Sequence, residues 1–475
     1  MNKRRIVLAA ILLAILSFPA AVAADRWSAD ELRAILADRI DQDRQGVGIV
    51  VGLVDEQGSL VVGHGRRGPD DSRAPDGQTV FEIGSVTKVF TAILLAEMVE
   101  RDKLGLNDPV EKFLPEAVRV PARDGAEITL YGLATHTSGL PRMPGNFAPA
   151  DPANPYADYG VQQMYDFISG HELTRKPGER AEYSNLGTAL LGHALSRAAG
   201  VDYEGLVLSR IAEPLGMQDT AITLSDKLRA RLATGHDRDL HPTSNWDVPT
   251  FAGAGALRST VDDMLRFVAA NLRAADSPIS AALRETHRPR EDLTAGKMKI
   301  GLGWIVAEKD DRTIHWHNGG TGGYHSFVGF DAEHGAGVVV LSNCTNSIDD
   351  IGLHLLDREV ELADFEPPSV SSEIPDSPAG AALAAWVEMT RSGKAAAARE
   401  HFDAGFTEEK NVNRTASSPL HKLSDGLHRR VLNDNVVFDH SAMHLLMDRL
   451  EEAVRVSSIS AIVCVANRCI RSLGV

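Results

Sequence analysis

Strand-like sequence stands at both ends of a helix-rich middle, and this order limits what the chain can fold into. Two short apolar runs, Val47–Val54 and Leu60–His64, enclose a polar turn at residues 55–58, which predicts a hairpin. Two further strand-like runs, Thr313–Phe330 and Gly335–Asn343, follow the helical patterns. The order predicts an α+β fold in which the first and last strands share one antiparallel sheet.

The length and the two ends of the chain predict several segments. A chain of 475 residues is long enough for more than one domain. Residues 1–24 combine a basic start, a short apolar core and small residues at the end, which predicts a signal peptide, with an uncleaved anchor as the alternative. Residues 366–378 are rich in Pro and Ser and predict a linker. We therefore expect a main domain at 25–365 and an accessory domain of unknown role at 379–475.

The predicted accessory domain carries no chemical motif. Two helical patterns, 381–402 and 444–454, precede a strand-like end, which predicts a small α+β extension. Cys464 and Cys469 lie in this end and can pair in an oxidising compartment, whereas Cys344 is expected to be a buried apolar thiol.

The charge balance excludes some partners. The formal net charge is −16, and an acidic chain is a poor ligand for nucleic acid or for an anionic membrane surface. After cleavage of the predicted signal peptide, we expect no transmembrane anchor and a location in a periplasm or outside the cell.

The stretch Phe81–Leu104 carries the first chemical signal. An apolar run at helical spacing follows Ser85, which we expect at or beside the helix N-cap, and Lys88 comes one turn later. A serine hydroxyl is a weak nucleophile until a neighbouring group takes its proton, and an amine one turn away can do so. The alternative is a capping serine followed by a solvated lysine.

A second motif, Tyr183-Ser184-Asn185, can complete the proton transfer. A lysine ammonium would push Tyr183 toward phenolate, so that it could take the proton of Ser85 and deliver it to a leaving group. Asn185 could donate to a substrate amide while holding Lys88. The alternative is a Tyr and an Asn at the start of an ordinary helix.

The third motif lies in the strand candidate near the end of the main domain: His317-Asn318-Gly319-Gly320. Such a strand can line a cleft and bind an extended substrate, and the two glycines allow close backbone approach. The backbone N–H of Gly320 could form an oxyanion hole with that of Ser85. The proline-rich loop at 142–159 is long and irregular, and we expect it to border the cleft.

Two neighbouring histidines could in principle bind a metal ion. His315 and His317 share one face of the predicted strand, but no carboxylate or third histidine stands at a matching spacing. We therefore expect no metal. The chain also has no P-loop and no dinucleotide fingerprint, so we expect no cofactor. His136 is expected to stabilise its loop rather than to act as a base.

Taken in order, the motifs resemble those of the penicillin-recognising serine hydrolases, which include class C β-lactamases, DD-carboxypeptidases and related esterases. The three matching motifs are Ser85-x-x-Lys88, Tyr183-x-Asn185 and His317-x-Gly319. Three further stretches are also similar to this family: 133–141, 177–187 and 214–220. The resemblance extends over residues 28–343.

The resemblance implies a fold and a set of roles. The fold would be β-lactamase/transpeptidase-like, an antiparallel sheet flanked by helices, with a mostly helical lobe and a cleft between them. Ser85 would be acylated, and Lys88 and Tyr183 would share the proton transfer. Asn185 would orient the substrate amide, and His317 would face the carboxylate or ester end.

One departure from the family pattern bears on the substrate. Typical class C β-lactamases carry Lys-Thr-Gly where this chain has His317-Asn318-Gly319, and a histidine is neutral much of the time at pH 7. We therefore predict a D-Ala-D-Ala peptidase with weak β-lactam hydrolysis, acting on stem peptides of peptidoglycan. The alternatives are a class C-like β-lactamase, an esterase for small esters, and a non-catalytic wall-binding or sensor protein.

Overall fold

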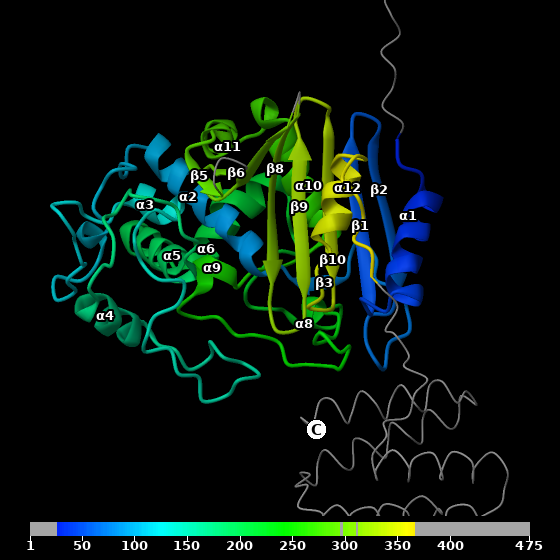
Figure 1. The fold of residues 1–475 in the computed structure, drawn as a ribbon, viewed down its shortest axis with the longest axis horizontal. Coiled ribbons are helices and arrows are strands. Elements are labelled where there is room, and N and C mark those ends of the chain that lie inside the picture. Colours follow the sequence, from blue (N-terminus) through cyan, green and yellow to red (C-terminus); the bar gives the residue numbers. More distant parts are fainter. Residues whose placement is uncertain (1–25, 295–297, 310–311, 366–475) are drawn as a thin grey trace, which may run out of the picture. The chain divides into compact units, whose positions relative to one another are not determined.

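The computed structural model describes residues 26–294, 298–309 and 312–365 (Figure 1). The chain divides into two units, Met1–Phe365 and Glu366–Val475, and the described residues belong to the first. Several predictions lie outside the described residues: the signal peptide at 1–24, the linker at 366–378, the accessory domain at 379–475, and Cys464 and Cys469.

One antiparallel sheet holds eight strands of the described unit (Figure 1). Its order is β2-β1-β10-β9-β8-β7-β6-β5. The strands are β1 Gly48–Asp55, β2 Gly58–Gly65, β5 Glu291–Thr294, β6 Met298–Ile300, β7 Ile305–Lys309, β8 Arg312–Gly320, β9 His325–Asp331 and β10 Ala336–Ser342. Because β1 pairs with β10, the prediction that the first and last strands share a sheet is confirmed. A small second sheet pairs β3 Val80–Glu82 with β4 Arg258–Thr260.

Helices form the remaining layers. They are α1 Ala29–Ala37, α2 Thr87–Glu100, α3 Leu130–Ala134, α4 Val161–Gly170, α5 Asn185–Ala199, α6 Tyr203–Val207, α7 Glu213–Leu215, α8 Asp226–Arg229, α9 Ala252–Gly255, α10 Val261–Leu272, α11 Ser280–His287 and α12 Asp349–Leu356. Further segments are π-helical, η1 Asp38–Gln42 and η4 Leu208–Ala212, or 3-10 helical, η2 Gly84–Val86, η3 Val110–Phe113 and η5 Ala274–Asp276. Within the described residues, no helix is long and apolar enough to span a bilayer.

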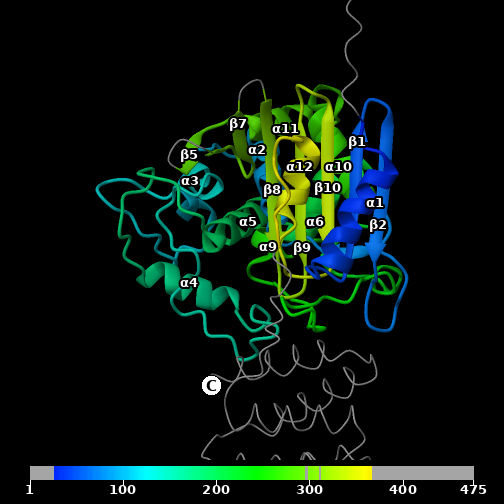
Figure 2. The same ribbon diagram turned by 45° about the vertical axis from the view of Figure 1, so that its right-hand side comes forward.

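Both faces of the sheet are buried. Along β1, Val50 belongs to the large core that includes Phe90 of α2, whereas Val51 belongs to a second core with Leu36 of α1 and Ile351 of α12. Figure 2 shows α1 and α12 on one face of the sheet and α10 on the other. Because successive side chains of a strand point to opposite faces, a strand covered on both sides reads as one continuous apolar run.

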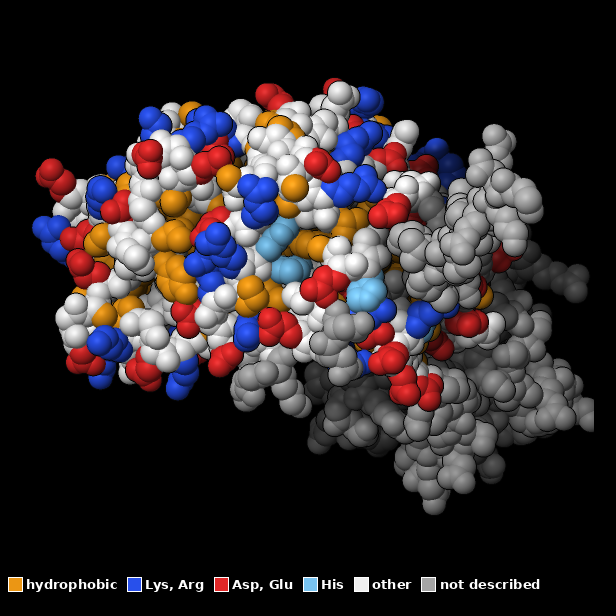
Figure 3. Space-filling view, turned by 90° about the horizontal axis from the view of Figure 1, so that it is seen from above, with side chains coloured by type: hydrophobic (Ala, Val, Ile, Leu, Met, Phe, Trp, Pro, Cys, Tyr) orange, Lys and Arg blue, Asp and Glu red, His pale blue; other side chains and the backbone are white. Residues whose placement is uncertain are grey.

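The helical lobe lies beside the sheet, with α2 between the two (Figure 1). Helices α5, α6 and α9 pack against α2 in this lobe. On the face seen in Figure 3, acidic and basic side chains are intermingled, with hydrophobic side chains between them. Opposite charges therefore offset one another across this face.

Cys344, which follows β10, is fully buried. Its thiol lies 3.2 Å from the backbone oxygen of Asp237, and burial raises the pKa of the thiol to about 11. The expectation of a buried thiol is confirmed, and a thiol with such a raised pKa is a poor nucleophile at neutral pH.

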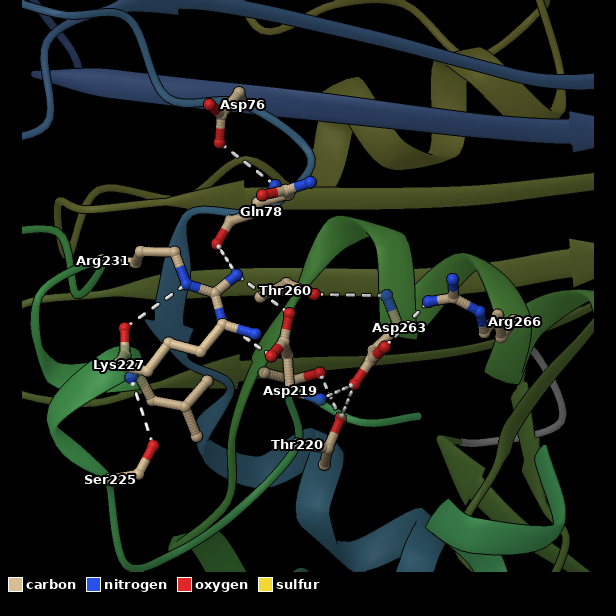
Figure 4. A network of polar contacts seen from close by, with 12 residues as sticks. Asp76, Gln78, Asp219, Thr220, Ser225, Lys227, Arg231, Thr260, Asp263 and Arg266 are labelled. Atoms are coloured by element: carbon tan, nitrogen blue, oxygen red, sulfur yellow. Dashed lines mark hydrogen bonds and ion pairs between the residues drawn. The ribbon is translucent and has the colours of Figure 1, made fainter. Parts of the chain in front are cut away.

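A network of polar contacts joins the small second sheet to α10 (Figure 4). Thr260 caps α10, since its hydroxyl accepts a hydrogen bond from the backbone N–H of Asp263. The Asp263 carboxylate, 2% exposed, accepts hydrogen bonds from the backbone N–H of Asp219 at 2.7 Å and the hydroxyl of Thr220 at 2.9 Å. Asp219 in turn pairs with Arg231 at 2.6 Å. The network thus ties residues 219–231 to the end of β4.

We expect Asp263→Ala to lower the free energy of unfolding by about 2–4 kcal/mol, because two buried donors lose their acceptor. The change can be measured by denaturant unfolding. The neighbouring Asp262 has no side-chain partner among the described residues, so Asp262→Ala serves as the matched control. Equal, small losses in the two variants would contradict the role given to the network.

Candidate active site

Ser85 lies in the η2 turn between β3 and α2. The residue at the N-cap of α2 is Val86, and no side chain caps this helix. The Ser85 hydroxyl therefore stands beside the N-cap but does not satisfy a helix N–H. It is half-buried and lines a pocket together with Asn185 and Gly320.

Lys88, in the first turn of α2, is buried. Its Nζ lies 2.8 Å from Ser85 Oγ and 2.7 Å from the backbone oxygen of Ala254. Burial, together with the charge of Arg142, lowers the pKa of Lys88 well below its usual value. The buried environment thus favours a neutral amine, which can accept the proton of Ser85.

Tyr183 stands over the same pair of residues. The centre of its ring lies 5.0 Å from Lys88 Nζ. Burial raises the pKa of Tyr183 to about 12, although a hydrogen-bonding contact with Ser85 acts in the opposite direction. The expectation that the lysine pushes Tyr183 toward phenolate is therefore wrong for this state. The physical reason is that the same enclosure that hides the phenol also disfavours the ammonium form of Lys88.

Asn185 begins α5, directly after the N-cap residue Ser184. Its Nδ2 lies 3.7 Å from Met143 Sδ, and its buried Oδ1 has no hydrogen-bond partner among the described residues. We expected Asn185 to hold Lys88, and this is wrong, because Lys88 instead contacts Ser85 and a backbone oxygen. The amide of Asn185 therefore keeps hydrogen-bonding capacity for a substrate.

His317 reaches the site from β8. It is fully buried, and its Nδ1 lies 2.5 Å from the backbone oxygen of Asn318. Burial and the nearby Lys88 lower the pKa of His317 to about 4. The imidazole is therefore neutral at pH 7. Its ring centre lies 6.3 Å from that of Tyr183, and its Nε2 has no partner among the described residues.

The side chain of Asn318 faces away from these groups. Its Nδ2 donates to Asp349 of α12 at 2.6 Å. Its cross-strand neighbour Phe327 belongs to the core under α12, whereas Val328, opposite His317, belongs to the core under α2. Side chains alternate along a strand, so Asn318, which we expected to bind substrate, points to the other face of the sheet from His317.

Two glycines let the end of β8 lie against the Ser85 turn. A Cβ on Gly319 would come 2.1 Å from the backbone oxygen of Ile83 and 2.8 Å from the backbone nitrogen of Ser85. Gly84 has a φ of +47°, and a Cβ on it would come 2.8 Å from the backbone nitrogen of Gly320. Substitution at either position would push the strand away from the turn. The close approach brings the backbone of Gly320 next to Ser85.

An aromatic wall closes one side of the pocket. It is formed by three aromatic residues, Tyr156, Trp246 and Phe251, together with Val248. The Tyr156 ring centre lies 5.3 Å from that of Trp246 and 5.4 Å from that of Phe251. Tyr156 belongs to the loop at 142–159, so the expectation that this loop borders the cleft is confirmed.

A buried ion pair holds Trp246 in this wall. Glu82, 3% exposed, accepts hydrogen bonds from the Trp246 backbone N–H at 3.0 Å and from Arg258 at 3.3 Å. Arg258 also donates to the backbone oxygen of Trp246 at 2.7 Å. Sequence reasoning missed Glu82 and Trp246. The only signal was the position of Glu82 just before the Ser85 turn.

His136 lies under Tyr183, with the two ring centres 4.5 Å apart. Its Nδ1 accepts a hydrogen bond from the Ser184 backbone N–H at 3.3 Å, and its backbone oxygen accepts one from the N–H of Glu182 at 2.8 Å. Both contacts fix the loop before α5. They support the structural role expected for His136.

Three histidines with lowered pKa values make stability depend on pH. Burial lowers the pKa of His136 and of His287 to about 3 each, and that of His317 to about 4. Below the ordinary value of 6.5, the unfolded chain binds protons that the folded chain does not. We therefore expect the melting temperature to fall as the pH decreases from about 6.5 toward 4, and His287→Gln to flatten this slope. A melting temperature that is constant over this range would contradict the assignment.

Comparisons with known proteins identify the family of the chain. A family model described as Beta-lactamase matches residues 32–360. The D-alanyl-D-alanine-carboxypeptidase/endopeptidase AmpH of Escherichia coli (strain K12) is 30% identical over 348 residues, which cover 70% of this chain and 89% of AmpH.

Solved structures show the same fold. A β-lactamase/D-alanine carboxypeptidase from Yersinia pestis superposes with a TM-score of 0.62 at 26% identity, over 71% of this chain and 99% of that one. A class C β-lactamase from Rhodobacter sphaeroides gives a TM-score of 0.60 at 23% identity, over 69% and 98%. The predicted β-lactamase/transpeptidase-like fold is confirmed. The chain belongs to the β-lactamase family of serine hydrolases.

Proposed function

We propose that this chain is an exported D-Ala-D-Ala peptidase that works through an acyl-enzyme on Ser85. The observation that carries the proposal is the 2.8 Å contact between Ser85 Oγ and the buried Nζ of Lys88. Burial favours the neutral form of this amine. A neutral amine in hydrogen-bond contact is a general base for a serine nucleophile.

The reaction would proceed in two halves. Ser85 Oγ attacks the carbonyl carbon of the scissile amide while Lys88 takes its proton. Tyr183, neutral and adjacent, passes a proton to the leaving nitrogen, so the amine departs and the acyl-ester remains. In the second half, Tyr183, now a phenolate, takes a proton from a water that attacks the ester, and Lys88 returns its proton to Ser85 Oγ as the acid departs. The backbone N–H groups of Ser85 and Gly320 would stabilise the oxyanion in both halves.

The remaining pocket residues would hold the acyl part of the substrate. The unpaired amide oxygen of Asn185 is suited to accept a hydrogen bond from a peptide N–H. The aromatic wall suits an apolar side chain on the same part of the substrate.

One departure from the class C pattern and one relative bear on the substrate. His317, at the position where class C β-lactamases carry a lysine, is neutral at pH 7, so it gives no permanent charge for a substrate carboxylate, whether of a β-lactam or of a peptide. The relative AmpH is named a carboxypeptidase and endopeptidase. We therefore propose stem peptides of peptidoglycan as substrates, with weak β-lactam hydrolysis, and export through the predicted signal peptide to a periplasm or the outside.

Hydrolysis of small esters is the second candidate. A neutral His317 and the aromatic wall of the pocket also suit an uncharged substrate. Rates for a p-nitrophenyl ester and for a D-Ala-D-Ala peptide can be compared directly. A peptide rate far below the ester rate would favour the esterase.

The role of Ser85 as the nucleophile is tested by intact-protein mass spectrometry with a penicillin. We expect a covalent adduct on the wild type and none on Ser85→Ala, because the hydroxyl is the attacking group. Hydrolysed penicillin is assayed in the same samples. Drug that is hydrolysed without a lasting adduct, and only when Ser85 is present, would instead favour a β-lactamase. Full activity of Ser85→Ala would rule out the mechanism.

A further prediction concerns the aromatic wall. We expect Trp246→Ala to reduce kcat/KM about tenfold for a phenylacetyl ester relative to an acetyl ester, because the larger acyl group loses its apolar contact. Trp27 lies outside this pocket, so Trp27→Ala is the matched control. Equal losses for the two esters would mean that the wall does not receive the acyl group.

A further inference from the structure

We propose that Arg142 binds the anionic end of the substrate's leaving group and so supplies the cation that His317 does not. The proposal rests on acylation of Ser85 as proposed above. It names a further specificity-determining residue, outside the three motifs, for substrates with a carboxylate on the leaving group.

The backbone around Arg142 is fixed to the start of α5. The backbone oxygen of Arg142 accepts hydrogen bonds from the N–H groups of Asn185 at 3.1 Å and Leu186 at 3.2 Å. The Ser184 hydroxyl donates to the preceding backbone oxygen, that of Pro141, at 2.6 Å. Arg142 therefore extends from a fixed point beside the Tyr183-Ser184-Asn185 motif.

The side chain of Arg142 is exposed. Its guanidinium carbon lies 5.1 Å from the centre of the Tyr183 ring. Its charge also acts on the pKa values of Lys88 and of Tyr156, which lines the pocket. Within the part of the chain that the structure describes, its guanidinium has no hydrogen bond or ion pair. All of its donors are therefore available to a ligand.

The other basic groups that we place at the site are engaged or neutral. Lys88 contacts Ser85 and a backbone oxygen. Arg258 is buried against Glu82. His317 has a pKa of about 4 and is uncharged at pH 7. Of these four groups, only Arg142 offers an accessible, permanent charge.

The position of Arg142 fits the leaving-group side. Tyr183 is the proposed proton donor to the leaving nitrogen, and Arg142 stacks beside its ring. In a D-Ala-D-Ala substrate, the terminal carboxylate is attached one carbon from that nitrogen. A guanidinium presents a planar pair of donors that matches a carboxylate.

The test compares two aryl esters with the same acyl group, one with a carboxylate on the leaving phenol and one with the methyl ester of that carboxylate. For Arg142→Met, we expect kcat/KM for the charged ester relative to the uncharged one to fall roughly 10- to 100-fold. Arg142→Lys should recover part of this preference. Arg119, exposed and bonded to the backbone of Glu116, provides the control Arg119→Met, which should keep the wild-type ratio.

Salt gives a second readout. The preference of the wild type for the charged ester should weaken as sodium chloride is raised from 0.05 to 0.5 M, and that of Arg142→Met should not, because exposed charges are screened. An unchanged ratio in Arg142→Met, or equal losses on both esters, would overturn the proposal. Aryl esters report acylation without peptide cleavage. A wild type that cleaves esters but no D-Ala-D-Ala peptide would therefore refute the proposed peptidase activity. The ratio of kcat/KM for the charged and the uncharged ester would still test the role of Arg142.

Discussion

The site depends on one buried amine. The side chain of Lys88 extends from α2 and is buried, and its Nζ contacts Ser85 Oγ and the backbone oxygen of Ala254 in α9. An ammonium in such a place loses hydration that two contacts do not replace, so the neutral amine is favoured. The same enclosure keeps Tyr183 protonated and His317 neutral. A single physical effect, desolvation, thus sets the protonation of three groups around one serine.

Close backbone packing sets the rest of the geometry. The end of β8 reaches the Ser85 turn only because Gly319 and Gly84 have no side chains. Elsewhere at the pocket, the buried pair of Glu82 and Arg258 fixes the backbone of Trp246 and with it the aromatic wall. Replacing both members of a buried ion pair by apolar residues often costs little stability, whereas removing one member leaves the other as an uncompensated buried charge. Its value here lies in holding a loop from another part of the chain at the cleft.

Sequence reasoning found the residues whose chemistry shows in a short motif. Ser85 and Lys88 are one helical turn apart, and Tyr183 and Asn185 begin a helix, so local spacing was enough to propose them. Glu82, Trp246 and Arg142 belong to no such motif. Each matters through partners far away in the sequence, as when Glu82 meets Trp246 across more than a hundred and sixty residues. No local pattern records a contact of that kind.

By itself, the sequence determined the α+β order, the pairing of first and last strands in one sheet and the family motifs, because these follow from hydrophobic periodicity and residue spacing. Only the tertiary structure decided the charge states and the direction of side chains. The raised pKa of Tyr183 favours a neutral phenol rather than a phenolate, and Asn318 proved to face α12 rather than the cleft. The reason is that burial and the choice of sheet face depend on what packs against a residue, and those neighbours come from distant parts of the chain.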